Sequence, residues 1–415
     1  MWVLLKRTSW AVLAGLALVV SSLTASFTAL GESADAPEAS FTGSAEAGTG
    51  WAEFRIGYYD NSDSGDGNPF LDEELTVIEP IFIMDYNITD RLAAWGQFSY
   101  DYVSSASIDR LSNFDNQSGA SGDNYIGFDF GARYELDEDR RVGGFFTTSF
   151  EYDYNSYGLG GDYAQDFANK DATVKISLNG YYDEVDVIRF NGKEEGTDDR
   201  ISISTTLSWY QILNPRTHAE MGGTFGFQHG FLETAYNAVV IEDPTDPPNP
   251  NLDNRARGTE IAEALPSARL RWSLFGRTRY SLVPGTALEM GGRLYIDSWG
   301  ILSVTVEPRV NHWLTDAIGL RLSYRYYTQT AADDFEDHFT EISTRRTQDS
   351  DLAGFDSHGL YGSALWRPLE TLSLDVTAGY TFRDDGIDQL TLSFGIRKSF
   401  DTRWLSKYWD RMSNR

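Results

Sequence analysis

The sequence predicts an all-β fold: a transmembrane antiparallel up-and-down β-barrel of about sixteen strands, preceded by an N-terminal signal peptide. Two observations predict it. Apolar and polar residues alternate over stretches of about ten residues, which is the period of a strand with one apolar and one polar face. The connections between these stretches are alternately short and long. Both features are typical of outer-membrane barrels, whose strands cross the lipid with every second side chain facing it.

The first 31 residues have the three parts of a signal peptide. Lys6 and Arg7 form its positive start, and an apolar run follows from Trp10 to Val20. Small residues then place the cleavage site between Gly31 and Ala36. The alternative is a single membrane anchor. Either reading predicts export from the cytoplasm.

The alternation divides the rest of the chain into three parts. We expect a periplasmic N-terminal segment at 32–50, the barrel at 51–400 and a periplasmic tail at 401–415. The strand-like runs begin near Trp51, Leu75, Arg91, Asn124, Arg141, Ser156, Ala172, Arg200, His218, Ala268, Ala287, Leu302, Gly319, Gly359, Leu372 and Asp388. The runs from Ser156 and Gly359 alternate less clearly, so fourteen strands is the alternative count. The stripe from Leu390 to Phe400 resembles the C-terminal signal that the barrel-assembly machinery reads.

The even-numbered connections are short and rich in turn-forming residues, as in Asn87–Asp90. The long connections are all odd-numbered: 60–73, 104–123, 182–199, 230–266 and 329–357. Those five segments hold 30 acidic against 7 basic residues, in a chain of net charge -28. Sorting of loop length by parity predicts tight turns on the periplasmic side and long acidic loops outside. The loop 230–266 either folds into the lumen or stays mobile outside.

Several short motifs resemble a known family of bacterial proteins. They include Tyr295, Asp297–Ile301, Tyr324–Tyr327 and Gln329 with Ala331–Asp333. Further pieces are Tyr58–Tyr59, Val77–Pro80, Tyr100–Asp101, Ser104–Ser107, Ser156–Leu159, Asp166–Phe167 and Asn169–Lys170. Together they resemble the family called domain of unknown function 3570 (DUF3570). The resemblance implies an outer-membrane protein of diderm (Gram-negative) bacteria, and it implies no activity.

The inner face of the predicted barrel carries the best functional candidates. Alternation turns inward the basic residues Arg269, Arg271, Arg293, Arg309, Arg321 and Arg325, together with Arg277, Arg279 and Arg397. It also turns inward the acidic residues Glu53, Glu79, Asp101, Asp129 and Glu307, with Glu289 and Asp375. A basic wall that faces an acidic wall across water sorts solutes by charge. The alternative is a barrel filled by salt bridges, because buried charges must be paired.

These features favour a porin-like channel for small solutes. The alternative function is a non-conducting barrel that acts as scaffold or binding partner for a periplasmic lipoprotein or a redox protein. Genes for flavin attachment and thioredoxin-like proteins near members of the family suit a redox partner. The expected contacts are outer-membrane lipid and, during biogenesis, the barrel-assembly machinery. No nucleic-acid partner is expected.

No motif predicts catalysis, so we expect no enzyme activity. The sequence has no cysteine, which excludes disulfides and covalent attachment of haem through cysteine pairs. The acidic run Asp333, Asp334, Glu336 and Asp337 offers hard oxygen ligands that would suit Ca²⁺ if a turn brought them together. Solvated loop charge is the alternative for this run. No other cofactor is expected.

Overall fold

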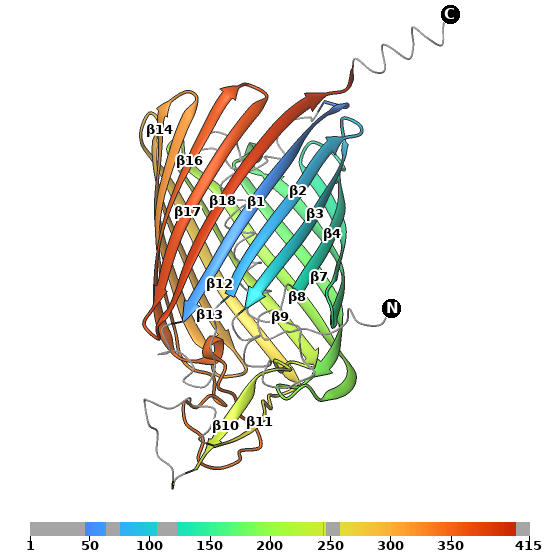
Figure 1. Ribbon diagram of the computed structural model, residues 1–415. Coiled ribbons are helices and arrows are strands. Elements are labelled where there is room, and N and C mark those ends of the chain that lie inside the picture. Colours follow the sequence, from blue (N-terminus) through green and yellow to red (C-terminus); the bar gives the residue numbers. More distant parts are fainter. Residues whose placement is uncertain (1–45, 64–74, 106–122, 244, 246–257, 404–415) are drawn as a thin grey trace, which may run out of the picture.

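One closed antiparallel barrel makes up most of the molecule (Figure 1). The computed structural model describes residues 46–63, 75–105, 123–243, 245 and 258–403. Each barrel strand pairs with the strands before and after it, and the first pairs with the last. The ring holds 16 strands, which confirms the predicted fold class and the higher of the two strand counts. Within the described part of the chain, no helix is long and apolar enough to cross a membrane.

The strands begin close to the positions that the alternation predicts. The ring consists of β1 (Thr49–Asp63), β2 (Leu75–Asn87), β3 (Leu92–Ser105), β4 (Asp123–Glu135), β5 (Arg140–Phe150), β6 (Tyr154–Phe167), β7 (Ala172–Ile188), β8 (Glu194–Asn214), β9 (Thr217–Gly230), β12 (Ala268–Val283), β13 (Thr286–Asp297), β14 (Leu302–Thr315), β15 (Ile318–Gln329), β16 (Phe355–Leu369), β17 (Leu372–Arg383) and β18 (Ile387–Asp401). A separate hairpin consists of β10 (Ala238–Glu242) and β11 (Gly258–Ala262). Two single helical turns are η1 (Ala168–Lys170) and η3 (Ser350–Leu352).

The ring closes between β1 and β18. The two strands pair continuously, from Thr49 opposite Asp401 to Asp63 opposite Ile387. The outward stripe predicted in β18 is present, because Leu392, Phe394 and Ile396 are all exposed. Closure leaves no unpaired sheet edge, which is the condition for a sheet to cross a membrane.

The outer face of the barrel is apolar. Large side chains point outward from all sides of the ring, such as Leu159, Leu274 and Met221, and each is more than 60% exposed. In water, an apolar surface of this extent around a whole molecule would be unstable. The outer face therefore suits contact with lipid tails.

The inner face is polar, and aromatic rings fill its glycine positions. The Trp95 ring of β3 lies over Gly131 of β4, where an added Cβ would come within 2.3 Å of the ring. Phe145 of β5 covers Gly160 of β6 in the same way, at 2.1 Å. These glycines let bulky inner side chains lie flat against the wall, which narrows the bore without breaking the ladder.

The two ends of the barrel differ. The seven connections at the end where β1 begins and β18 ends are short, and the predicted turns are confirmed there. We call this the termini end and the other the cap end. At the cap end, the prediction of a long loop at 182–199 is wrong. Strands β7 and β8 pair through it, with Tyr182 opposite Ile201 and Asp186 opposite Thr197, and residues 189–193 connect them. The two strands satisfy each other's backbone groups, so the ladder continues beyond the neighbouring strands.

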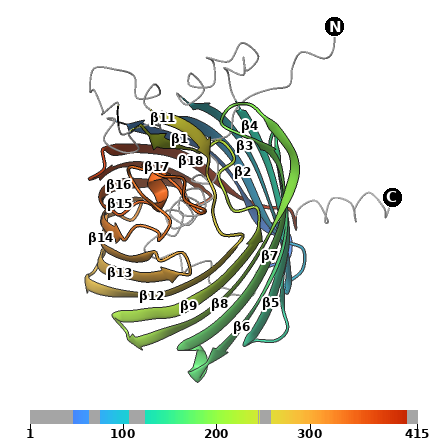
Figure 2. The same ribbon diagram turned by 90° about the horizontal axis from the view of Figure 1, so that it is seen from below.

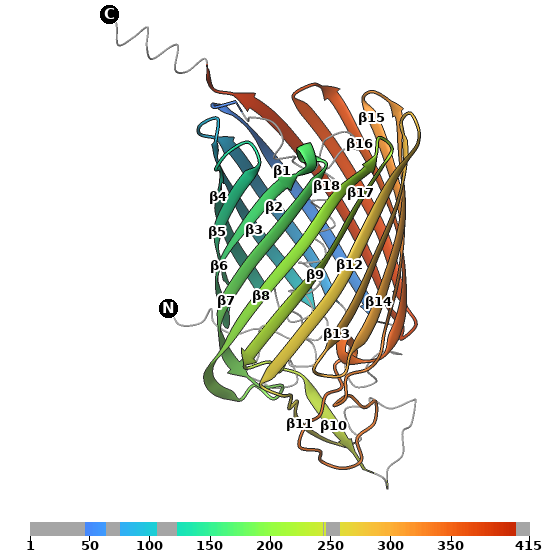
Figure 3. The same ribbon diagram turned by 180° about the vertical axis from the view of Figure 1, so that it is seen from behind.

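Two loops at the cap end form one packed body, which we call the cap. It comprises the described residues of 231–267, including the β10–β11 hairpin, and residues 330–354. Figure 2 shows it lying over part of the barrel's opening, and Figure 3 shows β10 and β11 projecting beyond the end of the wall. A parallel bridge joins Ile241 to Phe339, and an antiparallel bridge joins Ala264 to Arg346. The described part of the 230–266 loop is thus folded onto the second loop.

Candidate functional site

Register decides which side chains line the bore. In each ladder, residues directly opposite each other point to the same face, so the pairing of Arg271 with Asp297 and of Arg293 with Phe275 places all four on the inner wall. The sixteen inner residues predicted from the sequence lie on strands β1–β4, β12–β15, β17 and β18. Their surroundings fall into four groups, of which two are neutralised by ion pairs and two are not.

The first group lies near the termini end, across the seam of the barrel. Arg55 of β1 contacts Glu53 at 2.8 Å and Asp375 of β17 at 2.9 Å. Arg397 of β18 contacts the other oxygen of Glu53 at 2.7 Å. The side chains of Arg55 and Glu53 are buried. These contacts connect β1, β17 and β18, so they stabilise the seam and offer no free charge to a solute.

The second group lies on β13 and β14. Arg309 contacts Glu289 at 2.9 Å and Glu307 at 2.6 Å. Arg277 of β12 lies 3.8 Å from Glu289, and its side chain is 42% exposed. Arg321 of β15 donates to Asn311 Oδ1 at 2.7 Å. In this second group, Arg309, Arg277 and Arg321 therefore each contact a carboxylate or amide side chain of a neighbouring residue.

The third group lies nearer the cap end of the same wall. Arg269 of β12 donates from Nε to Asp297 at 2.8 Å and stacks over Trp299, 4.2 Å from the ring centre. The remaining three arginines of this region have no carboxylate within ion-pair distance among the described residues. Arg271 is half-buried, Arg293 is exposed and donates to Ser273 Oγ at 3.0 Å, and Arg325 lies 5.7 Å from the Tyr327 ring centre.

The fourth group is acidic and lies on the opposite wall. Glu79 of β2 and Asp101 of β3 face each other and share a hydrogen bond, and Asp129 of β4 lies beside Thr147. Seven strands separate β3 from β13 in either direction around the ring. The bore therefore has a basic side and an acidic side.

The cap contains a carboxyl group buried away from water. Glu263 is 2% exposed and accepts hydrogen bonds from the Thr234 backbone at 2.7 Å and from the Thr347 hydroxyl at 2.5 Å. Burial, with the nearby charge of Asp349, raises the pKa of Glu263 to about 8. Burial and the charge of Asp351 raise the pKa of Asp349 to about 6. The cap core is therefore most stable when these groups carry protons.

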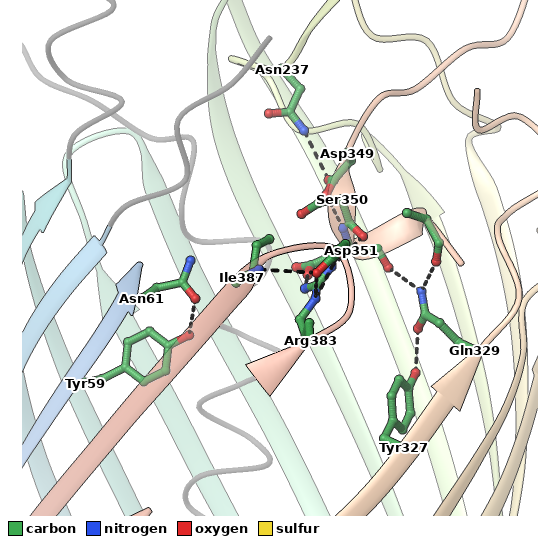
Figure 4. A network of polar contacts seen from close by, with 12 residues as sticks. Tyr59, Asn61, Asn237, Tyr327, Gln329, Asp349, Ser350, Asp351, Arg383 and Ile387 are labelled. Atoms are coloured by element: carbon green, nitrogen blue, oxygen red, sulfur yellow. Dashed lines mark hydrogen bonds and ion pairs between the residues drawn. The ribbon is translucent and has the colours of Figure 1, made fainter. Parts of the chain in front are cut away.

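The cap is attached to opposite sides of the wall. On the β5–β7 side, Tyr236 donates to Asp153, and Ala235 and Tyr236 pack on Val187. On the other side, Arg383 of β17 contacts Asp351 and the Ser350 carbonyl, and Gln329 of β15 donates to the carbonyls of Asp351 and Ala353 (Figure 4). Asn237 connects the two loops through Asp349. The cap thus bridges the mouth of the barrel.

The predicted acidic run takes part in the cap through its backbone. The Asp333 amide donates to the Trp299 carbonyl at 2.7 Å, and the Asp334 carbonyl accepts from the Thr347 amide at 3.0 Å. Among the described residues, no three carboxylate or histidine side chains come close enough to hold a metal ion. The Ca²⁺ hypothesis for this run therefore gains no support from the geometry.

Sequence reasoning missed several residues that matter here. Arg55 was within reach, since it shares the inward face of β1 with Glu53 two residues earlier. Arg383 lies at the end of a strand whose alternation is clear, and the same rule places it inside. Glu263 and Asp349 had no such signal, because the cap loops have no period that tells inside from outside.

The comparisons with known proteins find one matching family model and several solved structures with similar folds. A family model described as "Protein of unknown function (DUF3570)" matches residues 122–383. A search of curated protein sequences finds no match.

Among solved structures, a bacterial polysaccharide outer membrane secretin is similar with a TM-score of 0.48 and 11% identity, over 84% of this chain and 98% of that one. The siderophore receptor PirA from Acinetobacter baumannii gives 0.44 and 9%, over 82% and 53%. The CymD monoaromatic hydrocarbon channel gives 0.40 and 10%, over 86% and 90%. This chain spans about half the length of the siderophore receptor. All three TM-scores lie below 0.5, so these likenesses say nothing about function.

Proposed function

This chain belongs to the DUF3570 family, whose description assigns no function, and from its own geometry we propose that it is a porin-like outer-membrane channel for small solutes. The apolar outer face supports the membrane location. The cap end faces the outside of the cell and the termini end faces the periplasm, since the tight turns, the start of β1 and the end of β18 share one end.

One observation carries the channel proposal: charged inner side chains stay in contact with water. Arg293 is exposed although it points into the barrel, and Arg277 is 42% exposed. A barrel filled by salt bridges would bury such groups and pair them. Sixteen strands also give a ring of the size that leaves an aqueous bore in porins. The bore therefore offers a water-filled path between the two ends.

The cap restricts that path at its outer mouth. It is attached to opposite walls, and Ala238, Val239 and Val240 are buried in its core. Solutes enter beside the cap or when it moves. This arrangement favours a channel of limited access over an open pore.

The test is conductance of the purified, refolded chain in planar lipid bilayers. We expect stepwise current increases on insertion, in the range of water-filled barrels. A chain that migrates as a folded, heat-modifiable band yet adds no current would overturn the proposal. That result would favour the scaffold function, in which the barrel binds a periplasmic lipoprotein or redox protein.

A further inference from the structure

Five arginines gather on the inner wall toward the cap end, but only two of them have carboxylate partners. Arg269 pairs with Asp297, and Arg200 of β8 contacts Asp183 at 2.8 Å. Arg271, Arg293 and Arg325 have no ion pair among the described residues. We call these three the arginine track. Five guanidinium groups less two carboxylates leave three positive charges on one side of the bore.

Positive charges within this group of five arginines repel one another. Arg293 and Arg325 interact unfavourably across β14, and Arg271 interacts unfavourably with both Arg269 and Arg200. Like charges at this spacing cost free energy that water screens only in part inside a narrow bore. An anion that binds between these arginines would offset their repulsion and stabilise the folded barrel.

The donors of the track are also incompletely used. The Nε of Arg271 is buried and has no hydrogen-bond partner among the described residues. Arg293 uses one nitrogen on Ser273, which leaves most of its five N–H groups free for a ligand. Guanidinium groups bind carboxylate and phosphate oxygens in pairs of parallel hydrogen bonds. The track therefore offers several unfilled positions for oxyanions.

The three arginines lie at separate positions along the wall. Arg271 is on β12, Arg293 on β13 and Arg325 on β15, and the ladders place them at different heights. A ligand with two or more anionic groups matches more than one of these separated charges. On the opposite wall, the carboxyl groups of Glu79, Asp101 and Asp129 offer such a ligand no cationic partner.

We infer that the arginine track is a binding site for small organic anions that carry two or more carboxylate or phosphate groups. This inference rests on the proposed channel, because the site lies on the wall of its bore. The inference names the class of solute that binds to the channel wall during passage. Binding weakens as salt rises, since the interaction is charge-based and partly solvated.

The test is calorimetric titration of the detergent-folded chain with citrate as the polycarboxylate and pyrophosphate as the phosphate probe. We expect saturable binding of at least one probe, and the two arms identify the preferred oxyanion. Arg293→Gln and Arg325→Gln should each weaken it about tenfold, as for one charged hydrogen-bonding group. Arg277→Gln is the matched control, because it removes an exposed inner arginine of β12 outside the track, and it should leave binding within about twofold.

Stability gives a second readout. Because Arg293→Gln and Arg325→Gln relieve repulsion, both variants should keep the melting temperature of the wild type or raise it. Unchanged binding in both Arg293→Gln and Arg325→Gln, or an equal loss in Arg277→Gln, would overturn the site. These results do not depend on current: a silent barrel that binds citrate would overturn the channel and keep the site, whereas a conducting barrel that binds neither probe would do the reverse.

Discussion

The barrel wall and the cap are stabilised in opposite ways. In the wall, large apolar side chains point outward, and the interior is polar and held by ladders and ion pairs. In the cap, a group of apolar side chains points inward and forms a core: Ala238, Val239 and Val240 are at most 1% exposed. The wall needs lipid to satisfy its outer face, whereas the cap packs as a small soluble domain does. The same chain therefore contains a wall that is apolar on the outside and a cap that is apolar on the inside. A substitution that destabilises one of them should leave the other folded.

The largest expected difference between the two regions is their accessibility: the cap should be reached from outside the cell, and the short connections only from the periplasm. In this cysteine-free chain, Ile342→Cys in the cap should react with a membrane-impermeant maleimide on intact cells, because its side chain is 71% exposed. Asp316→Cys, in a short connection at the termini end, should react only after the outer membrane is permeabilised. Labelling of Asp316→Cys on intact cells, with Ile342→Cys protected, would reverse the orientation.

Loss of the Arg55 ion pairs at the seam should lower the stability of the barrel wall. Arg55→Met leaves the buried Glu53 and the half-buried Asp375 with one cationic partner fewer, which costs about 3–5 kcal/mol. We expect a lower melting temperature for the heat-modifiable folded band on gels. Arg140→Gln removes an exposed ion pair with Asp137 in a turn, in which Arg140 Nε donates to Asp137 Oδ2 at 2.6 Å, and should change little. Equal melting of the two variants would mean that the seam does not depend on Arg55.

The sequence predicts the wall well because one rule governs every strand. A side chain on the wrong face would place a charge in lipid or an apolar group in the bore, so alternation is enforced from β1 to β18. The exception at 182–199 fits this explanation. Strands β7 and β8 continue beyond their neighbours, where Asp183, Glu184 and Asp186 follow one another closely and Val187 packs against the cap instead of lipid. Alternation disappears there, although the ladder does not.

The sequence predicts the candidate site only in part. Inward direction follows from the period, so the basic and acidic walls could be expected. Pairing does not follow, because it depends on register between strands that are distant in sequence, as for Arg55 and Asp375. The cap was beyond reach for a further reason. Its core joins residues near 240 to residues near 348, and no local pattern specifies that contact.

A matched pair of substitutions separates the two regions. Val240→Ala removes a side chain that is 1% exposed in the cap core, at a cost of about 2 kcal/mol for the lost burial and the cavity left behind. Val310→Ala removes the same atoms from the outer wall, where the side chain is 42% exposed, and should cost less. Limited proteolysis should cleave the cap faster in Val240→Ala while the barrel band resists digestion. Equal cleavage of both variants would show that the cap has no core of its own.

The pH dependence of the cap follows from its buried carboxyl groups. The folded cap holds the Glu263 proton more tightly than the unfolded loops do, because burial raises the pKa of this group to about 8. Stability of the cap is therefore greatest below the ordinary pKa of glutamate and falls as pH rises through about 8. The raised pKa of Asp349, about 6, acts in the same direction. Proteolysis of the cap should be faster at pH 9 than at pH 6, and Glu263→Gln should reduce that difference.

Single-channel conductance at pH 6 and pH 9, for the wild type and Glu263→Gln, tests most directly whether a stable wall surrounds a water-filled bore that the cap covers. We expect the wild type to conduct at both pH values and to conduct more at pH 9, where the cap is weakened. Glu263→Gln should show a smaller difference, because glutamine does not titrate. No current at either pH would contradict the bore, and an equal pH response in the two proteins would contradict the role of the cap.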